Sequence, residues 1–262
     1  MTQKYENPVV ELLFQLADDD YLFSYRGSEW LGLAPHIEED VAFSSITQDT
    51  MGHATVYYRL LEGLGLGVAD TLAHMRPATE RKNSILVERP NGEGVYMETP
   101  RYDWAYAVAR SYIYTTAKKI KIDSLKSSSD QSLAEAAVKI SMELYYHLLH
   151  WKTWFVQLFN STEDARNRMT KALEKVIADC GDLFSYGDAA TEITNASLIE
   201  SEQVLLNRWT EYVKPVFETI KVAVPTFGKP ERNGRNGEHT KELQYAINTM
   251  SEVYRTDLTA AW

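Results

Sequence analysis

The sequence has one cysteine, an excess of acidic residues and no long apolar run. A single cysteine, Cys180, excludes an internal disulfide framework and is typical of a reducing compartment. Its neighbours Asp179 and Asp182 disfavour a thiolate, so we expect a buried structural cysteine. The 37 acidic and 27 basic residues give a net charge of −10. This balance disfavours a nucleic-acid partner, because phosphate neutralisation requires clustered lysine and arginine.

Several signatures of other protein classes are also missing. No stretch approaches the roughly 20 apolar residues of a membrane span, and Met1 to Asn7 has no apolar signal core. The chain has no Gly-x-Gly-x-x-Gly opening a helix, no phosphate loop, no Cys-x-x-Cys and no Gly-x-Ser-x-Gly elbow. We therefore expect a cytoplasmic protein with no membrane or nucleic-acid partner.

Apolar residues recur at three- and four-residue steps along most of the chain, which predicts helices. Helices are expected over residues 8–25, 35–61, 102–125, 132–159, 161–184, 197–217 and 240–254. The pattern breaks over residues 68–100, which have several prolines and glycines and a short helix predicted near residues 70–75. Ser84–Glu88 is the best strand candidate, and residues 222–237 are predicted to be a loop.

The helix ends carry their own signals. Asn7-Pro8 is a cap followed by proline, and Ser132-x-x-Glu135 and Ser161-x-x-Asp164 are capping-box candidates. Pro215 is expected to kink or end its helix. Two helix pairs joined by one long crossover predict an all-α, ferritin-like four-helix bundle with additional C-terminal helices, as a single domain over residues 1–262.

The tract Gln48-Asp49-Thr50-Met51-Gly52-His53 resembles a metal-site motif with one ligand changed. Carboxylate-bridged di-iron bundles use Glu-x-x-His, because residues three apart share one helix face and reach the same metal. Here Thr50 stands three residues before His53, and a hydroxyl does not replace an anionic carboxylate. The motif predicts the architecture of an oxygen-activating protein without its metal chemistry.

The other predicted bundle helices do not supply the missing ligands. His147 and His150 are an i, i+3 pair whose first member is again not a carboxylate. The helix over residues 102–125 has no carboxylate near its middle. The nearest ones, Asp103 and Asp123, lie about 12 Å from the middle by helical rise. Two or three imidazoles with one carboxylate suit a borderline metal such as zinc better than iron.

We therefore assign no catalytic, cofactor-binding or metal-binding residue in this chain, and keep His53, His147 and His150 as vestigial metal candidates. The alternative for His53 is a satisfied interior histidine, and His147 has Glu143 four residues earlier as a pairing partner. The run Asp18-Asp19-Asp20 is expected to be largely a solvated face, with one member in a buried hydrogen bond or an ion pair with Arg26 or the 102–125 helix.

Short motifs in a fixed order along nearly the whole chain resemble one family. They are Leu16-Ala17-Asp18-Asp19 with Ser28-Glu29-Trp30, Ala34-Pro35 with Glu38 and Asp40, Gln48-Asp49-x-x-Gly52-His53, Glu88-x-Pro90-Asn91-Gly92, Glu143-x-x-Tyr146-His147, and Gly237-x-His239-Thr240-x-x-Leu243 with Trp262. In this order the chain resembles the C subunits of bacterial phenylacetyl-CoA epoxidases (ring 1,2-epoxidases).

The resemblance implies a ferritin-like, non-catalytic structural subunit of a multicomponent di-iron monooxygenase in phenylacetate catabolism. It implies a homologous catalytic A subunit as partner, which holds the di-iron centre and the thioester substrate, while this chain holds no cofactor. A homodimer is expected where that partner is missing. Thr50 occupies a place where some relatives carry Glu, and most of the C-terminal third departs from the family pattern.

Two other functions stay open from the residues alone. One is a di-metal carboxylate and histidine oxygenase in its own right, with unusual ligands. The other is a helical interaction protein from a different pathway that kept only the fold. Dense aromatic residues over residues 102–159 fit a bundle core, and some fit a subunit interface, where Tyr and Trp are enriched.

Overall fold

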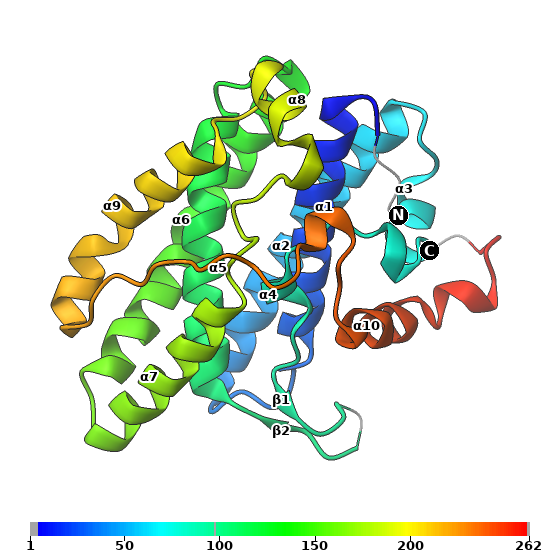
Figure 1. Cartoon of the computed structure of the whole chain (residues 1–262). Helices are drawn as coiled ribbons and strands as arrows, with labels where there is room; N and C mark the ends of the chain where they lie inside the picture. The colour runs from blue at the N-terminus through cyan, green and yellow to red at the C-terminus, as the bar shows by residue number, and fades with distance from the viewer. Residues whose placement is uncertain (1–4, 97, 261–262) are drawn as a thin grey trace. The chain divides into compact units, whose positions relative to one another are not determined.

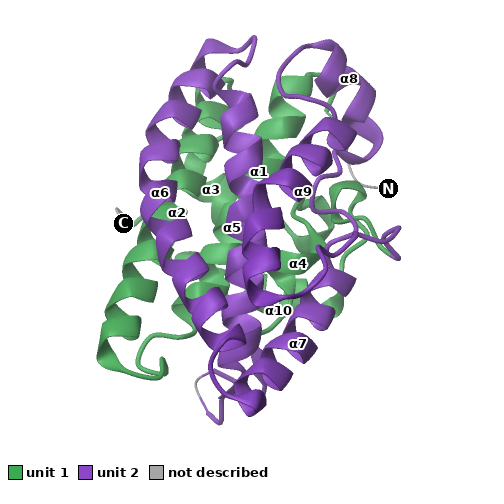
Figure 2. Cartoon of the chain, turned by 90° about the vertical axis from the view of Figure 1, so that its left-hand side faces the viewer, with its two compact units in different colours: residues 1–90, 232–262 green, residues 91–231 purple. Residues whose placement is uncertain are grey.

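The computed structural model describes residues 5–96 and 98–260, in two compact units. Unit 1 comprises Met1–Pro90 and Arg232–Trp262, and unit 2 comprises Asn91–Glu231 (Figure 2). Helices dominate both units, and the sheet found in the described residues has two strands of two residues each. The predicted all-α class is therefore confirmed, and the order of helix pair, crossover, helix pair and further helices is that of the ferritin-like topology. The single domain over residues 1–262 stays a prediction.

Unit 1 is built on the helix pair α1 (Pro8–Ser28) and α2 (Ile37–Gly63), which run alongside each other (Figure 1). Asn7 caps α1 by accepting a hydrogen bond from Val9 N at 3.0 Å, as the Asn7-Pro8 pattern predicts. The two helices approach closely at Gly27, where a Cβ would collide with the side chain of Thr47 on α2.

Short elements complete unit 1. They are α3 (Ala69–His74), the 3₁₀ turn η1 (Ala78–Glu80), α4 (Ile85–Glu88), η3 (Gly234–Asn236), α10 (Lys241–Ser251) and η4 (Tyr254–Thr256). Residues from both ends of the chain thus meet in this unit: α10 packs against α1, α3 and α4.

Unit 2 begins with the strands β1 (Gly92–Glu93) and β2 (Arg101–Tyr102), which pair antiparallel with Gly92 opposite Tyr102. The helices α5 (Trp104–Leu125), α6 (Gln131–Phe159), α7 (Glu163–Ala178), α8 (Ala190–Asn195) and α9 (Glu202–Ile220) follow, with η2 (Gly187–Ala189) before α8. α5 is the central helix, because it packs against α6, α7 and α9.

An aromatic core joins α5, α6 and α9. Phe155 of α6 is fully buried and stacks on Tyr112 of α5 at 4.3 Å between ring centroids. The rings of Phe159 and Phe217 lie against the Phe155 ring, at 5.0 and 5.8 Å between centroids.

Cys180 is buried as predicted, and burial raises the pKa of its thiol well above the usual value, so the thiol stays protonated.

Several expectations about individual elements were wrong. Ser84–Glu88 is not a strand: its last four residues form the helical turn α4. All five residues are buried, and a short buried run is ambiguous between strand and helix by periodicity alone. The helix expected over residues 161–184 ends at Ala178, the one expected over 197–217 occupies Glu202–Ile220, and α8 and the β1–β2 pair were not predicted.

The cap assignments also shifted. Asp130 caps α6 and Thr162 caps α7, each with a side-chain oxygen that accepts a backbone N–H, in place of Ser132 and Ser161. Pro215 lies inside α9 without ending it.

Among the described residues, no helix is long and apolar enough to cross a membrane.

The aromatic core yields a stability prediction. Replacing Phe155 by alanine removes its three aromatic contacts and leaves a cavity, so we expect the free energy of unfolding to fall by about 3–5 kcal/mol. Urea unfolding followed by circular dichroism measures this. Tyr146→Ala on the same helix is the matched control, because Tyr146 is 70% exposed, and its effect should stay within about 0.5 kcal/mol. A loss below about 1 kcal/mol for Phe155→Ala would contradict the described packing.

Candidate functional site

The altered metal motif lies inside α2. Thr50 and His53 are both buried. The Thr50 hydroxyl donates a hydrogen bond to the carbonyl of Ile46 at 2.8 Å, one turn earlier in the same helix. This hydroxyl is therefore used by its own backbone, as is common for threonine inside helices. The structure places His53 in the interior, which fits the alternative of an interior histidine.

The second histidine pair lies on α6 in unit 2. His147 is buried, and His150 is partly exposed with its ring edge-on to Trp151 at 4.7 Å between centroids. Glu143 is exposed. Within the described ranges, residues 5–96 and 98–260, no group of three or more His, Cys, Asp or Glu side chains is arranged to hold a metal ion. The metal assignments stay predictions.

The aspartate run on α1 was expected to be a largely solvated face, and this was wrong. Asp18, Asp19 and Asp20 are all buried. The expectation of a buried ion pair is confirmed, and two of the three aspartates, Asp18 and Asp19, pair with arginines from outside α1 and α2. α1 is covered on nearly every side, so adjacent positions cannot escape to solvent.

Asp18 is the centre of the first buried group of charges. Its carboxylate accepts hydrogen bonds from Arg76 at 2.8 and 2.9 Å, from Arg81 at 3.1 Å, from the Tyr58 hydroxyl at 2.6 Å and from Lys82 N at 2.8 Å. Arg81 also donates to Tyr58 Oη at 3.1 Å. We call Asp18, Tyr58, Arg76 and Arg81 the Asp18 cluster.

Charge compensation decides the ionisation of this cluster. Burial acts to raise the pKa of Asp18, but the guanidinium groups of Arg76 and Arg81 and the Tyr58 hydrogen bond outweigh it and hold that pKa well below its usual range. Burial, with the Asp18 charge nearby, raises the pKa of the Tyr58 hydroxyl well above its usual value. Tyr58 therefore remains a donor to an ionised carboxylate.

Asp19 and Glu88 hold the C-terminal part of unit 1. Arg235 of η3 makes a two-pronged contact with Asp19 at 2.7 and 2.8 Å and also donates to the carbonyl of Lys82 at 2.7 Å. The Glu88 carboxylate lies 2.8 Å from His239 Nδ1 and accepts a hydrogen bond from Thr240 N at 2.6 Å. These contacts bring residues 235–240 onto α1 and α4.

The arginines were missed because they lie in segments predicted to be irregular, over residues 68–100 and 222–237. One signal was available: carboxylates within a strongly apolar helix are stable only when paired or hydrogen-bonded. That rule predicts that cations exist, but not which ones, since the partners are 58 to 216 positions away in sequence.

A second feature is an exposed apolar face on α6. Val138, Met142, Tyr145 and Leu149 recur at steps of four, three and four residues, and each is at least half exposed. Such steps place the side chains on one helix face. We call these four residues the α6 face. Contiguous exposed apolar surface on a protein marks an interaction site more often than chance.

The Asp18 cluster yields a prediction about stability. Asp18→Asn removes the charge that compensates two buried guanidinium groups, so we expect the free energy of unfolding to fall by about 3–5 kcal/mol. The matched control is Asp164→Asn on α7, whose ion pair with Arg168 at 2.9 Å is more than 70% exposed. That change should cost less than about 1 kcal/mol. Equal losses for the two variants in urea unfolding would contradict the role of the cluster.

A pH dependence follows from the same carboxylate. Its folded pKa is depressed, so its stabilisation is fully present above the unfolded pKa of about 3.9 and is lost as pH falls toward the folded pKa. The unfolding free energies of the wild type and Asp18→Asn should differ by a constant amount from about pH 7 to about pH 5. That difference should shrink by about 1 kcal/mol at about pH 3.

An uninformative variant is avoided by a second substitution at the same position. If Asp18→Asn does not fold, Asp18→Glu replaces it. This variant keeps a titrating carboxylate, so its free energy of unfolding should differ less from that of the wild type. A gap that stays constant down to about pH 3 for Asp18→Asn would contradict a depressed pKa.

Comparison with known proteins agrees with this structure. The family described as phenylacetic acid catabolic protein matches residues 1–262. The chain is 27% identical over 250 residues to the C subunit of 1,2-phenylacetyl-CoA epoxidase from Escherichia coli strain K12, an alignment that covers 95% of this chain and 97% of that protein. The resemblance drawn from the sequence motifs is thereby confirmed. This chain belongs to the phenylacetic acid catabolic protein family.

Proposed function

We propose that this chain is the structural, non-catalytic subunit of a phenylacetyl-CoA epoxidase, and that it pairs with a homologous catalytic subunit that carries the di-iron centre. The relative from Escherichia coli is named as the C subunit of such an epoxidase. A subunit of this kind acts on catalysis by holding the partner's metal-bearing helices in a fixed geometry.

The observation that carries the proposal is the use made of the buried carboxylates of α1. In a di-iron bundle, inward-facing carboxylates are neutralised by the metal ions they ligate. Here guanidinium groups neutralise Asp18 and Asp19 at 2.7 to 3.1 Å. The Asp18 carboxylate, which contacts two guanidinium groups, is poorly placed to ligate iron as well, because its lone pairs are already engaged in hydrogen bonds.

The residues of the altered motif do not fit a di-iron centre either. Thr50 offers a hydroxyl where a bridging carboxylate is required, and that hydroxyl is bonded to Ile46 O. No catalytic step is assigned to this chain. This favours the structural role over the alternative of a di-metal oxygenase with unusual ligands.

The α6 face supports pairing with another protein. Met142 and Tyr145 are 63% and 65% exposed, which leaves a large part of two apolar side chains in water. The cores of subunit interfaces are enriched in aromatic residues and methionine. We propose that this face is covered by the catalytic subunit, and that a homodimer of this chain uses it when the catalytic subunit is missing.

Co-expression with the catalytic subunit tests the proposal. We expect the two subunits to elute as one complex on size-exclusion chromatography. With electrons supplied by the reductase, the complex should epoxidise phenylacetyl-CoA, and this chain alone should show no epoxidase activity. Metal analysis should assign the iron to the catalytic subunit. About two iron atoms per copy of the isolated chain, as in a working di-iron protein, would overturn the structural role.

A charged substitution on the α6 face sharpens the test. Met142→Glu places a carboxylate in the buried interface, so we expect the complex to weaken at least about tenfold, since burying an unpaired charge costs several kcal/mol. Val204→Glu on α9 is the control, because Val204 is also an exposed apolar residue of unit 2, at 41%. Calorimetric titration of the two purified subunits measures both. Equal affinities for the two variants would show that α6 is not the docking face.

A further inference from the structure

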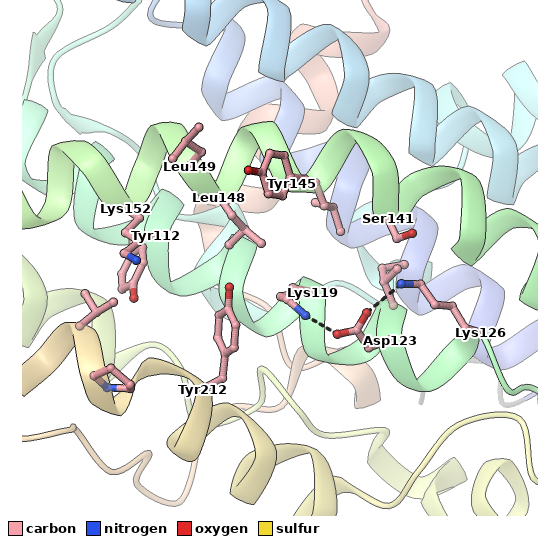
Figure 3. A pocket seen from close by; sticks show the side chains of 14 residues that line it. Tyr112, Lys119, Asp123, Lys126, Ser141, Tyr145, Leu148, Leu149, Lys152 and Tyr212 are labelled. Carbon is pink, nitrogen blue, oxygen red and sulfur yellow. Dashed lines mark hydrogen bonds and ion pairs between the residues drawn. The ribbon is translucent and has the colours of Figure 1, made fainter.

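Unit 2 has a cavity of about 510 Å³ between α5, α6 and α9 (Figure 3). Aliphatic, proline and tyrosine side chains form most of its wall, among them Leu148, Leu149, Tyr112, Tyr145 and Tyr212. The volume is within the range of small-molecule sites, which are apolar with a few placed polar groups. The resemblance to the epoxidase subunits implies no function for this cavity.

The charges that line the cavity are mostly cationic. Lys119, Lys126 and Lys152 contribute three positive charges and Asp123 one negative charge, in a chain whose net charge is −10. The charge of the cavity lining is therefore opposite in sign to the net charge of the chain. An anion is therefore the kind of ligand that the charge distribution favours.

Two of the three lysines already have an anionic partner. Lys126 Nζ lies 2.9 Å from Asp123, and Lys119 forms an ion pair with the other oxygen of the same carboxylate. Burial acts to raise the pKa of Asp123, but these two lysines lower it, so the carboxylate is ionised and compensates them. Lys119 also lies 4.9 Å from the centre of the Tyr212 ring, a cation–π distance.

Lys152 is different. It extends from α6 over the end of the cavity near Tyr112, away from the end occupied by Lys126 and Asp123 (Figure 3). In residues 5–96 and 98–260, no carboxylate forms an ion pair with Lys152. Burial raises the pKa of the Tyr112 hydroxyl, so this group stays protonated and can donate a hydrogen bond. An ammonium group and a hydroxyl donor thus lie at one end of an apolar cavity.

We propose that this cavity binds a small amphipathic anion, an apolar body bearing one carboxylate. The carboxylate is held by Lys152 and Tyr112, and the body lies between Leu148 and Tyr212. The lysine supplies charge, the tyrosine supplies a directed hydrogen bond, and the tyrosine and leucine side chains supply the surface that excludes water. This site goes beyond the proposed structural function and does not depend on it.

Calorimetric titration of the isolated full chain tests the site with two probes of matched shape. Naphthalene-2-carboxylate is the anion, and naphthalene-2-methanol is its neutral counterpart. We expect one anion to bind per chain, and the alcohol to bind roughly tenfold or more weakly, because it lacks the charge-assisted hydrogen bonds. Absence of binding by the carboxylate would overturn the proposal.

Substitutions at the carboxylate end locate the ligand. Lys152→Met should weaken binding of the carboxylate roughly tenfold and leave binding of the alcohol unchanged, and Lys152→Arg should restore most of the affinity. Tyr112→Phe, which keeps the ring that stacks on Phe155, should also weaken the carboxylate alone. Lys139→Met is the matched control, an exposed lysine of α6 outside the cavity, and should change neither affinity.

The alternative occupant is an apolar segment of a protein partner, since Tyr145 and Leu149 belong both to the cavity wall and to the α6 face. That occupant predicts equal binding of the two probes and no effect of Lys152→Met. This result would overturn the anion site and would leave the pairing with a catalytic subunit standing. Loss of pairing with retained, Lys152-dependent carboxylate binding would overturn the proposed function alone.

Discussion

The neutralisation of buried carboxylates by arginines from remote segments is the constraint on which unit 1 depends. α1 is buried on nearly every side, yet it carries three consecutive aspartates. An ionised carboxylate in such surroundings is tolerated only with opposite charge and hydrogen bonds around it. Arg76, Arg81 and Arg235 supply both, so the crossover and the segment after α9 must return to α1 for the unit to be stable.

The same constraint bears on function. Carboxylates that compensate guanidinium groups are engaged at short distance and leave little room for a metal ion. Unit 1 is thus stabilised by ion pairs internal to the chain. Unit 2 carries the features that face outward, namely the apolar α6 face and the cavity beside it. A stable interior and an exposed apolar face are the features that the proposed structural role requires.

Much of the fold was accessible from the sequence because apolar periodicity and caps are local signals. Residues 8–25 and 132–159 were predicted as helices within a few residues of α1 and α6. Ser84–Glu88 was misassigned because five buried residues in a row show no periodicity that separates a strand from a helix. The burial of Cys180 was predicted, and an interior His53 was one of the two alternatives, whereas Asp18-Asp19-Asp20 was expected to be a largely solvated face with only one buried member.

The sequence by itself determined the all-α class, the order of the long helices, the altered Thr50–His53 motif and the family. Each of these depends on residues close together in the chain or on the order of short motifs. Only the tertiary structure decided which cations meet Asp18 and Asp19, and which aromatic residues of α6 stay exposed. Pairing over 58 to 216 positions and the exposure of one helix face are set by packing between elements, which no local pattern encodes.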